Sequence, residues 1–199
     1  SIWKTNDVGA SFTLLHTFGT NENNQIKYIE VSSSNPNVIY CNQQPTSGSN
    51  GTLWKTTDGG NLWSQVNKPA GNSRRMLLSI NPLNENELWI AYPDGSNGFK
   101  VFKTSNSGTS WQNLSSFVLN DESVQSIAHV AGTNGGIYIA TNKAVYYRNN
   151  TTGFVIDNSG LPLFTNGNIL RPFYRDGKIR LATYGKGIWE SNMNEAPSL

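Results

Sequence analysis

The sequence predicts an all-β protein made of several small antiparallel sheets, and three observations support this fold class. A turn-forming octapeptide recurs about every 50 residues, around Asp7, Asp58 and Asn106. Between the turns lie short segments of alternating apolar and polar residues, bounded by Gly, Pro, Asn and Asp as strands are. No segment joins a helix start signal to an apolar helical period. A strand-rich repeat of this length predicts small sheets stacked radially or in line.

The octapeptide at residues 56–63 shows the chemistry of the repeat. The Asp58 carboxylate can accept hydrogen bonds from loop amides, and Gly60 can adopt a positive φ. Trp63 can fold its ring beneath the turn and bury on the order of 200 Å². We call the three copies the box turns; their fixed positions are Thr5, Asp7, Gly9 and Phe12, then Thr56, Asp58, Gly60 and Trp63, then Thr104, Asn106, Gly108 and Trp111. Asn106 keeps the acceptor oxygen without the charge, so we expect the same turn there.

Two further segments resemble parts of the repeat. Residues 145–148 lead into an eroded turn at 149–154, in which Asn150 occupies the acidic position. The segment from Ile188 to Ser191 matches the strand before a box turn and stops where the turn would begin.

The pattern resembles the Asp-box (BNR) repeat of β-propellers such as sialidases, xyloglucanase-type glycoside hydrolases, sortilin-like receptors and photosystem assembly factors. In that family the box is the hairpin between the third and fourth strands of a blade. The resemblance covers nearly the whole chain and implies four-stranded antiparallel blades around an axis. It says little about activity, because one fold serves many functions.

The strands are expected to make about four blades. Turn signals at Asn35-Pro36 and Asn81-Pro82 fall at matching places in successive repeats. The expected strands are 26–32, 38–42, 53–56 and 63–66; 76–80, 88–91, 99–104 and 111–114; 124–130, 137–141 and 144–148; and 169–174, 179–183 and 188–191. The expected blades are 1–17 (partial), 25–66, 76–114, 124–156 and 169–191 (partial), and 192–199 is interpreted as a linker-like tail.

Both ends of the chain present a third strand, at Ile2-Trp3 and Ile188-Trp189, so they cannot fill one slot of a single blade. We favour the C-terminal arc of a larger propeller; the alternative is a four-bladed ring closed by the N-terminal fourth strand. The segment 181–191 resembles the closing segment of secreted Bacteroidetes propellers exported by type IX secretion. This resemblance implies an extracellular or cell-surface location and further domains in the same polypeptide.

The composition narrows the possible partners. The net charge is +2 and no basic run is present, so neither nucleic acid nor an anionic membrane is expected to bind. No apolar run approaches the roughly 18–20 residues of a membrane-spanning helix. No signal peptide is visible and the chain begins inside a repeat, which indicates an excerpt of a longer protein. The single cysteine, Cys41, lies in an expected strand and is interpreted as a buried thiol.

Candidate binding residues lie on the face opposite the boxes, where ligands usually meet propellers of this family. Aromatic rings beside short polar groups could stack on sugars, and paired arginines could hold a carboxylate. The candidates are Arg74, Arg75, Tyr92, Asp94, Tyr184 and Lys186. Phe117 and Phe164 are interpreted as loop plugs that fill local core, and the box residues as structural.

The sequence favours no enzyme class. A sialidase-like site needs three converging arginines, and the Arg-Ile-Pro motif of those enzymes is absent. A xyloglucanase-like site needs two facing carboxylates, of which Asp94 or Asp121 could supply one. His16 and His129 are too few for zinc, so neither metal nor cofactor is expected. We predict a non-catalytic scaffold or a binding face for glycans or proteins, with an incomplete glycoside hydrolase lobe and a peptide-gripping receptor propeller as alternatives.

Overall fold

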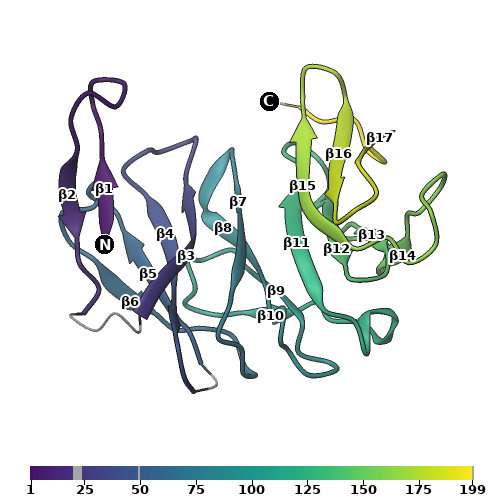
Figure 1. The fold of residues 1–199 in the computed structure, drawn as a ribbon, viewed down its shortest axis with the longest axis horizontal. Helices are drawn as coiled ribbons and strands as arrows, with labels where there is room; N and C mark the ends of the chain where they lie inside the picture. Colours follow the sequence, from purple (N-terminus) through teal and green to yellow (C-terminus); the bar gives the residue numbers. More distant parts are fainter. Residues whose placement is uncertain (20–23, 49, 199) are drawn as a thin grey trace.

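A computed structural model describes residues 1–19, 24–48 and 50–198, and there the chain folds into five antiparallel sheets with almost no helix (Figure 1). The N-terminal hairpin is followed by the first, second and third sheets, of four strands each, and by the three-stranded last sheet. The strands are β1 (Ile2–Lys4) and β2 (Thr13–His16) in the hairpin; β3 (Asn24–Val31), β4 (Ile39–Pro45), β5 (Thr52–Thr56) and β6 (Ser64–Val66); β7 (Leu77–Asn81), β8 (Asn84–Ala91), β9 (Val101–Thr104) and β10 (Gln112–Asn113); β11 (Val124–His129), β12 (Ile137–Thr141), β13 (Val145–Arg148) and β14 (Val155–Ile156); and β15 (Gly167–Phe173), β16 (Lys178–Thr183) and β17 (Ile188–Asn192). Among the described residues, one 3-10 helix, η1 (Phe117–Leu119), lies in the connection between β10 and β11.

The three box turns share one hydrogen-bond pattern. In each, the Thr hydroxyl donates to the Asp or Asn side chain at 2.7–2.9 Å and accepts from the Gly amide at 2.8–3.1 Å. The same side-chain oxygen then accepts an amide four residues later, at 2.9–3.0 Å. Asn106 makes this bond to Ser110 as Asp58 makes it to Leu62, so the turn does not require the charge.

Two details of the turns differ from expectation. Phe12 is mostly exposed, whereas Trp63 and Trp111 are half-buried, because in the described residues no sheet packs on the outer side of the N-terminal hairpin. In the eroded fourth turn the acceptor is Asn149 rather than Asn150, since Asn149 Oδ1 accepts the amides of Thr151 and Thr152 at 2.9 and 2.7 Å.

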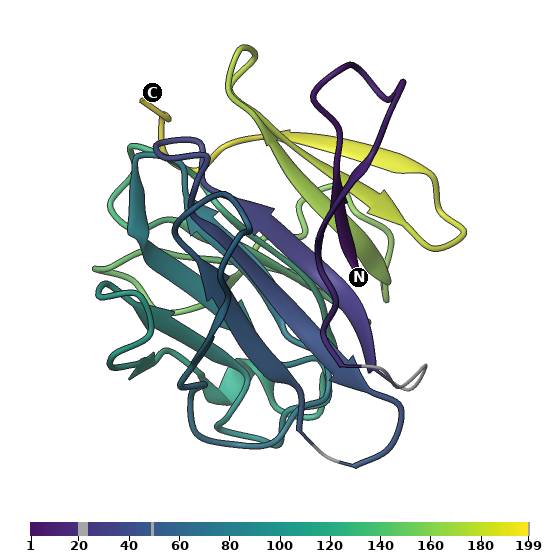
Figure 2. The same cartoon turned by 90° about the vertical axis from the view of Figure 1, so that its left-hand side faces the viewer.

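Apolar layers join each sheet to the next. Successive inner strands lie against one another, β3 on β7, β7 on β11 and β11 on β15, and the sheets follow in chain order along an open curve (Figures 1 and 2). Cys41 is buried, as predicted, where the hairpin meets the first sheet. His129 is buried against Trp89, with ring centroids 4.0 Å apart. Burial lowers the pKa of His129 to about 4, so the ring is neutral near pH 7.

The sequence predicts a linker-like tail at residues 192–199. In the structure, the described part of this tail is bound to the third sheet. Asn194 donates its amide to the Tyr138 hydroxyl at 2.7 Å. The Glu195 carboxylate accepts from the Tyr147 hydroxyl at 2.5 Å and from the Asn134 amide at 2.8 Å. These bonds fasten the tail across the third sheet. Among the described residues, no helix has the length and apolar character to cross a membrane.

Candidate functional site

A polar pocket of about 430 Å³ opens where the first and second sheets meet. The strands β3 and β4 supply part of its wall, and the connections from β6 to β7 and from β8 to β9 supply the rest. Its lining residues are Lys27, Tyr28, Gln44, Arg74, Arg75 and Asp94. We call this the arginine pocket. A smaller hollow that shares Arg74 and Asp94 adjoins it and extends toward Gly48 and Asn72.

The segment that carries the two arginines is held close to the first sheet. The Gly51 amide donates to Ser73 O at 2.8 Å, and a Cβ at Gly51 would lie only 2.2 Å from Arg74 O. The Ser73 hydroxyl donates to Arg75 O at 2.6 Å. This close approach of two backbones explains why glycine occupies position 51.

The charges of the arginine pocket are unequal. Three cationic side chains, Lys27, Arg74 and Arg75, line it together with the single carboxylate of Asp94. Arg75 Nη2 lies 3.6 Å from Asp94 Oδ1, and both side chains are substantially exposed, so this ion pair contributes little to stability. The pocket therefore carries an excess of positive charge.

Two groups in the wall add hydrogen-bonding capacity. Burial raises the pKa of the Tyr28 hydroxyl, and the nearby Arg75 opposes this shift, so the phenol is a neutral donor and acceptor near pH 7. Gln44 Oε1 is a buried acceptor with no hydrogen-bond partner among the described residues. An unpaired buried acceptor costs free energy unless a donor reaches it.

A second pocket, of about 230 Å³, also has Tyr28 in its wall and lies among the inner strands β3, β7, β11 and β15. We call it the axial pocket. It brings Glu30 of the first sheet near Arg171 of the last sheet. Burial raises the pKa of the Glu30 carboxyl to about 7, although Arg171 opposes that shift. Glu30 is therefore partly protonated at neutral pH.

The candidates chosen from the sequence separate into three groups. Arg74, Arg75 and Asp94 meet in the arginine pocket. Tyr92 is fully buried and donates its hydroxyl to Pro69 O at 2.9 Å, so it belongs to the core and not to the ligand face. Tyr184 is largely exposed in the β16–β17 connection, outside that pocket.

Lys186 and the two loop phenylalanines also differ from expectation. The Lys186 amine donates to the carbonyls of Leu163 and Phe164 at 2.6 and 3.3 Å, which fastens neighbouring loops. Phe117 and Phe164 are 81% and 75% exposed. They are therefore not the core plugs that the sequence suggested.

Sequence reasoning missed most of the polar residues that line the two pockets, among them Lys27, Tyr28, Gln44, Glu30 and Arg171. Lys27, Tyr28 and Glu30 lie on a strand whose alternation was interpreted only as core against surface. Gln44 lies beyond the expected end of its strand at residue 42, because β4 continues to Pro45. The available signal was the placement of Tyr28 and Glu30 on one face of an expected inner strand. Within the described residues, no three His, Cys, Asp or Glu side chains gather as a metal ion would need.

Comparisons with known proteins identify the fold. No protein-family model and no curated protein matches the chain. The GH74 enzyme of Niastella koreensis superimposes with a TM-score of 0.61 at 16% identity, covering 83% of this chain and 28% of that one. The GH74 xyloglucanase of Xanthomonas campestris gives 0.64 at 12%, covering 83% and 29%. YCF48 bound to D1 peptide gives 0.63 at 16%, covering 96% and 57%.

The chain has a β-propeller fold. At these identities the likeness concerns the fold alone. The chain spans between about a quarter and three fifths of the lengths of those three neighbours.

Proposed function

We propose that this chain is a non-catalytic β-propeller module whose arginine pocket binds a carboxylate-bearing partner, of which an acidic glycan is the favoured example. The supporting observation is the convergence of Lys27, Arg74 and Arg75 on one pocket that also holds the Tyr28 phenol. Arginine pairs recognise carboxylates through charge-assisted hydrogen bonds.

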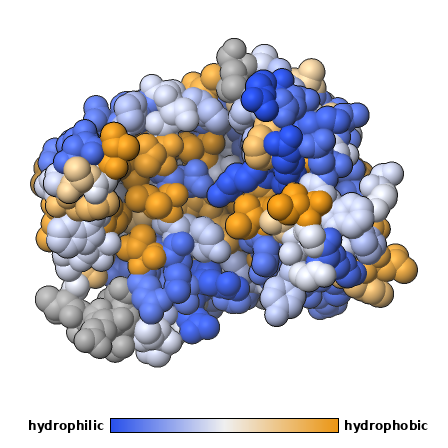
Figure 3. All heavy atoms as spheres, turned by 45° about the horizontal axis from the view of Figure 1, so that its top comes forward, coloured by the Kyte–Doolittle hydropathy of each residue, from blue (hydrophilic) through white to orange (hydrophobic). Residues whose placement is uncertain are grey.

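We further propose that the module is an arc of a larger propeller and that its turns are Asp boxes. The outer face of the last sheet carries a cross-strand apolar row, Ile169–Ala182–Ile188. The second sheet buries the corresponding row, Leu77–Ala91–Val101, against the third sheet. Such a row supports a further sheet packing on the outer face. Figure 3 shows hydrophobic residues at several places on the visible surface, separated by hydrophilic ones.

The proposed location is the cell surface or the exterior of a bacterium, which is what the resemblance of the segment 181–191 implies. The partners proposed are a glycan or a protein at the arginine pocket and further domains of the same polypeptide. The box turns have a structural role in this proposal, because their side chains are satisfied within each turn.

Binding can be tested by calorimetry with an acidic oligosaccharide, such as an oligogalacturonide, and a neutral oligosaccharide of the same length. The acidic ligand is expected to bind more tightly, and added salt is expected to weaken it. Arg75→Ala or Arg74→Ala is expected to weaken binding by roughly tenfold or more, since bonds to charged groups contribute about 1.5–3 kcal/mol.

The matched control is Arg175→Ala, which removes a guanidinium outside the arginine pocket, on the turn between β15 and β16. It is expected to leave the affinity unchanged. Equal binding of the neutral ligand, or equal weakening by Arg175→Ala, would contradict the assignment of the pocket.

One observation favours a second candidate, a lobe of a glycoside hydrolase. Glu30 is a carboxyl with a pKa of about 7, which suits a general acid. Glycoside hydrolysis usually needs a second carboxyl, and Asp94 is already paired with Arg75. We expect no hydrolysis of xyloglucan by the protein. Turnover that disappears in Glu30→Gln would establish the second candidate instead.

A further inference from the structure

The arginine pocket and the axial pocket adjoin at Tyr28, which lies in the wall of both. The smaller hollow at Arg74 and Asp94 adjoins the arginine pocket and extends toward Gly48. Together the three hollows make a row from that loop to the inner strands, which we call the trough. The axial pocket holds only about 230 Å³, less than the roughly 300–1,000 Å³ that is usual for a ligand site. It therefore fits an extension of the arginine pocket and not a separate site.

Within the described residues, three inner strands carry an extra residue, and each extra residue lines the trough. The register of β3 with β4 shifts between Ile26 and Tyr28, so Lys27 has no opposite residue. The same kind of shift leaves Gln125 without one in β11 and Asn168 in β15. Adjacent residues of a regular strand point to opposite faces, whereas a bulge redirects side chains. The bulge in β3 explains how Lys27 and Tyr28 both line one pocket.

Positive charge continues from the arginine pocket into the axial pocket. Arg171 of β15 lines the axial pocket, and its guanidinium makes no ion pair with the described residues. Its side chain donates to the carbonyl of the preceding residue, Leu170, at 3.2 Å. The side chains that β7 and β11 add to this pocket are all uncharged. The charge of Arg171 is therefore available to an anionic ligand.

Glu30 is the one carboxyl that lines the axial pocket in the described part of the chain. The titratable or charged groups that line the pocket with it are Arg171 and the phenol of Tyr28. Burial raises the pKa of Glu30 to about 7, although Arg171 opposes the shift. Below pH 7 the carboxyl is therefore mostly neutral, donates a hydrogen bond and leaves the charge of Arg171 uncompensated.

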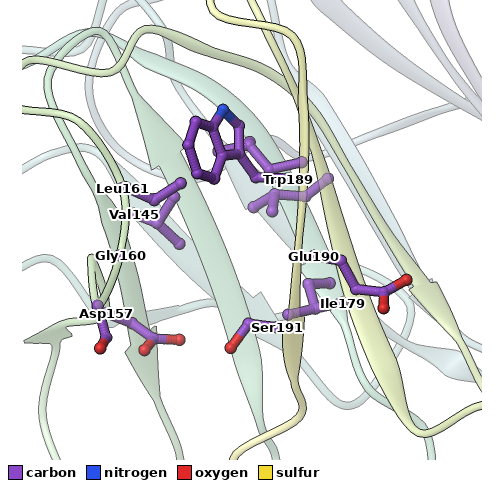
Figure 4. A pocket seen from close by; sticks show the side chains of 11 residues that line it. Val145, Asp157, Gly160, Leu161, Ile179, Trp189, Glu190 and Ser191 are labelled. Carbon is purple, nitrogen blue, oxygen red and sulfur yellow. The ribbon is translucent and has the colours of Figure 1, made fainter.

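A pocket outside the trough has the opposite charge. It holds about 250 Å³ between the third and last sheets, and Val145, Leu161 and Trp189 contribute to its wall (Figure 4). The carboxylates of Asp157 and Glu190 also line it, and among the described residues no cationic side chain does. An acidic ligand is repelled there, so the charge pattern directs such a ligand to the trough.

We propose that the trough binds a polyuronate, a glycan with carboxylates on successive sugar residues, with one carboxylate at Arg74 and Arg75 and another at Arg171. This inference rests on the proposed function of the arginine pocket, and it distinguishes a polyuronate from a glycan with a single acidic residue. The guanidinium of Arg171 holds the second carboxylate by charge-assisted hydrogen bonds. The bulged side chains of Gln125 and Asn168 hydrogen-bond to the sugar hydroxyls beside it.

Calorimetry with galacturonic acid and its linear oligomers of two to four residues tests the second contact. The natural protein is expected to gain roughly tenfold or more in affinity at the length that first reaches Arg171, as bonds between charged groups provide. Arg171→Ala is expected to bind the monomer normally and to lose that gain. Arg175→Ala removes the same charge from the turn after β15 and is expected to keep it. Equal gains with length in Arg171→Ala and the natural protein would overturn the proposal.

A tetramer with one free carboxylate and three methyl esters separates the effect of charge from the effect of length. Its free carboxylate occupies the arginine pocket, so the natural protein and Arg171→Ala are expected to bind it with equal affinity. Weaker binding of this ester by Arg171→Ala would overturn the proposal, because it would show that Arg171 recognises uncharged parts of the glycan.

The pH dependence of binding adds a readout that a structural role of Arg171 would not change. Between pH 6 and 8 Glu30 ionises, compensates Arg171 and repels the second carboxylate, while the uronate groups stay ionised. The advantage of the tetramer over the monomer is expected to shrink several-fold over this range in the natural protein and to stay constant in Glu30→Gln. An equal change with pH in both proteins would contradict a carboxylate beside Glu30.

Two outcomes separate the arginine pocket from its extension. If galacturonic acid binds and Arg75→Ala weakens it, while longer oligomers bind no more tightly, the proposed function stands and the contact with Arg171 is overturned. If no acidic oligomer binds more tightly than a neutral one of the same length, both are overturned.

Discussion

The second sheet and the last sheet carry the same cross-strand pattern in different surroundings. Leu77 and Val101 on the second sheet are 3% and 0% exposed, whereas their counterparts Ile169 and Ile188 on the last sheet are 49% and 77% exposed. All four side chains are aliphatic, so residue type does not explain the difference. The difference arises because the third sheet covers the first pair and nothing in the described residues covers the second pair.

The strand edges differ in the same way. After β9 the box turn returns the chain as β10, and Trp111 seals the boundary with the first sheet. After β17 the chain makes no box turn and crosses instead to the third sheet, where Glu195 is bound. A box turn therefore completes the edge of one sheet and fills the gap to the preceding sheet.

The largest expected effect on stability distinguishes the covered edge of the second sheet from the open edge of the last sheet. Trp111→Ala removes a half-buried indole and its hydrogen bond, and it is expected to destabilise the protein by about 3 kcal/mol. Trp189 is also half-buried and donates its indole N–H to Lys186 O at 2.7 Å, but it lines an open pocket. Trp189→Ala is therefore expected to cost about half as much. Urea denaturation of the two variants measures the difference. An equal or larger loss of stability in Trp189→Ala would contradict the difference drawn between the second and last sheets.

The pH dependence of stability tests whether Arg171 of the last sheet affects the carboxyl of Glu30 in the first sheet. The raised pKa of Glu30, about 7 against an ordinary value of 4.5, means that the folded protein keeps a proton which the unfolded chain releases. The stabilisation is complete below pH 4.5 and is lost as the pH rises through 7. Glu30→Gln is therefore expected to be more stable than the natural protein by about 3 kcal/mol at pH 8 and nearly equally stable at pH 4.5.

Arg171→Ala sharpens this measurement. Arg171 of β15 lowers the pKa of Glu30, so its removal is expected to increase the advantage of Glu30→Gln at pH 8. Denaturation curves at pH 4.5 and 8 supply the comparison. A pH-independent difference between Glu30→Gln and the natural protein would show that the carboxyl is solvated.

Asp58→Ala tests the turn that the last sheet lacks. It removes the oxygens that accept the amides of Asn61 and Leu62 and the hydroxyl of Thr56. The melting temperature is expected to fall by several degrees while affinity at the arginine pocket stays unchanged. An unchanged melting curve together with lost binding would contradict the structural role of the box turn, because it would show that Asp58 acts in binding instead.

The smallest effect is expected for Asn106→Asp. The carboxylate can keep the bonds from the Thr104 hydroxyl and the Ser110 amide. It can also accept the Ser110 hydroxyl, as Asp7 accepts that of Ser11 at 2.6 Å. Calorimetry is expected to find a change within about 0.5 kcal/mol. A large loss would mean that the amide has a role that the other turns do not share.

Local chemistry made the strands and turns predictable from the sequence. The side-chain hydrogen bonds of Thr56 and Asp58 join only groups within the turn, so a pattern of eight residues contains the chemistry that shapes it. The packing of His129 and Cys41 followed from strand alternation in the same way.

Long-range contacts were not predictable. Tyr92 stands beside Pro93 and Asp94 in a segment that resembles a surface loop, yet its hydroxyl reaches Pro69. Glu30 meets Arg171 only because the first and last sheets share the axial pocket. The tail is held by Glu195 through side chains of the third sheet, which no local pattern reveals.

Amide hydrogen exchange at β9 and β17 tests the central contrast most directly. If the last sheet has an open edge, the amides of Ile188 and Glu190 are expected to exchange rapidly while those of Val101 and Lys103, covered by β10, exchange slowly. Equally slow exchange at both edges in the monomeric protein would contradict the account.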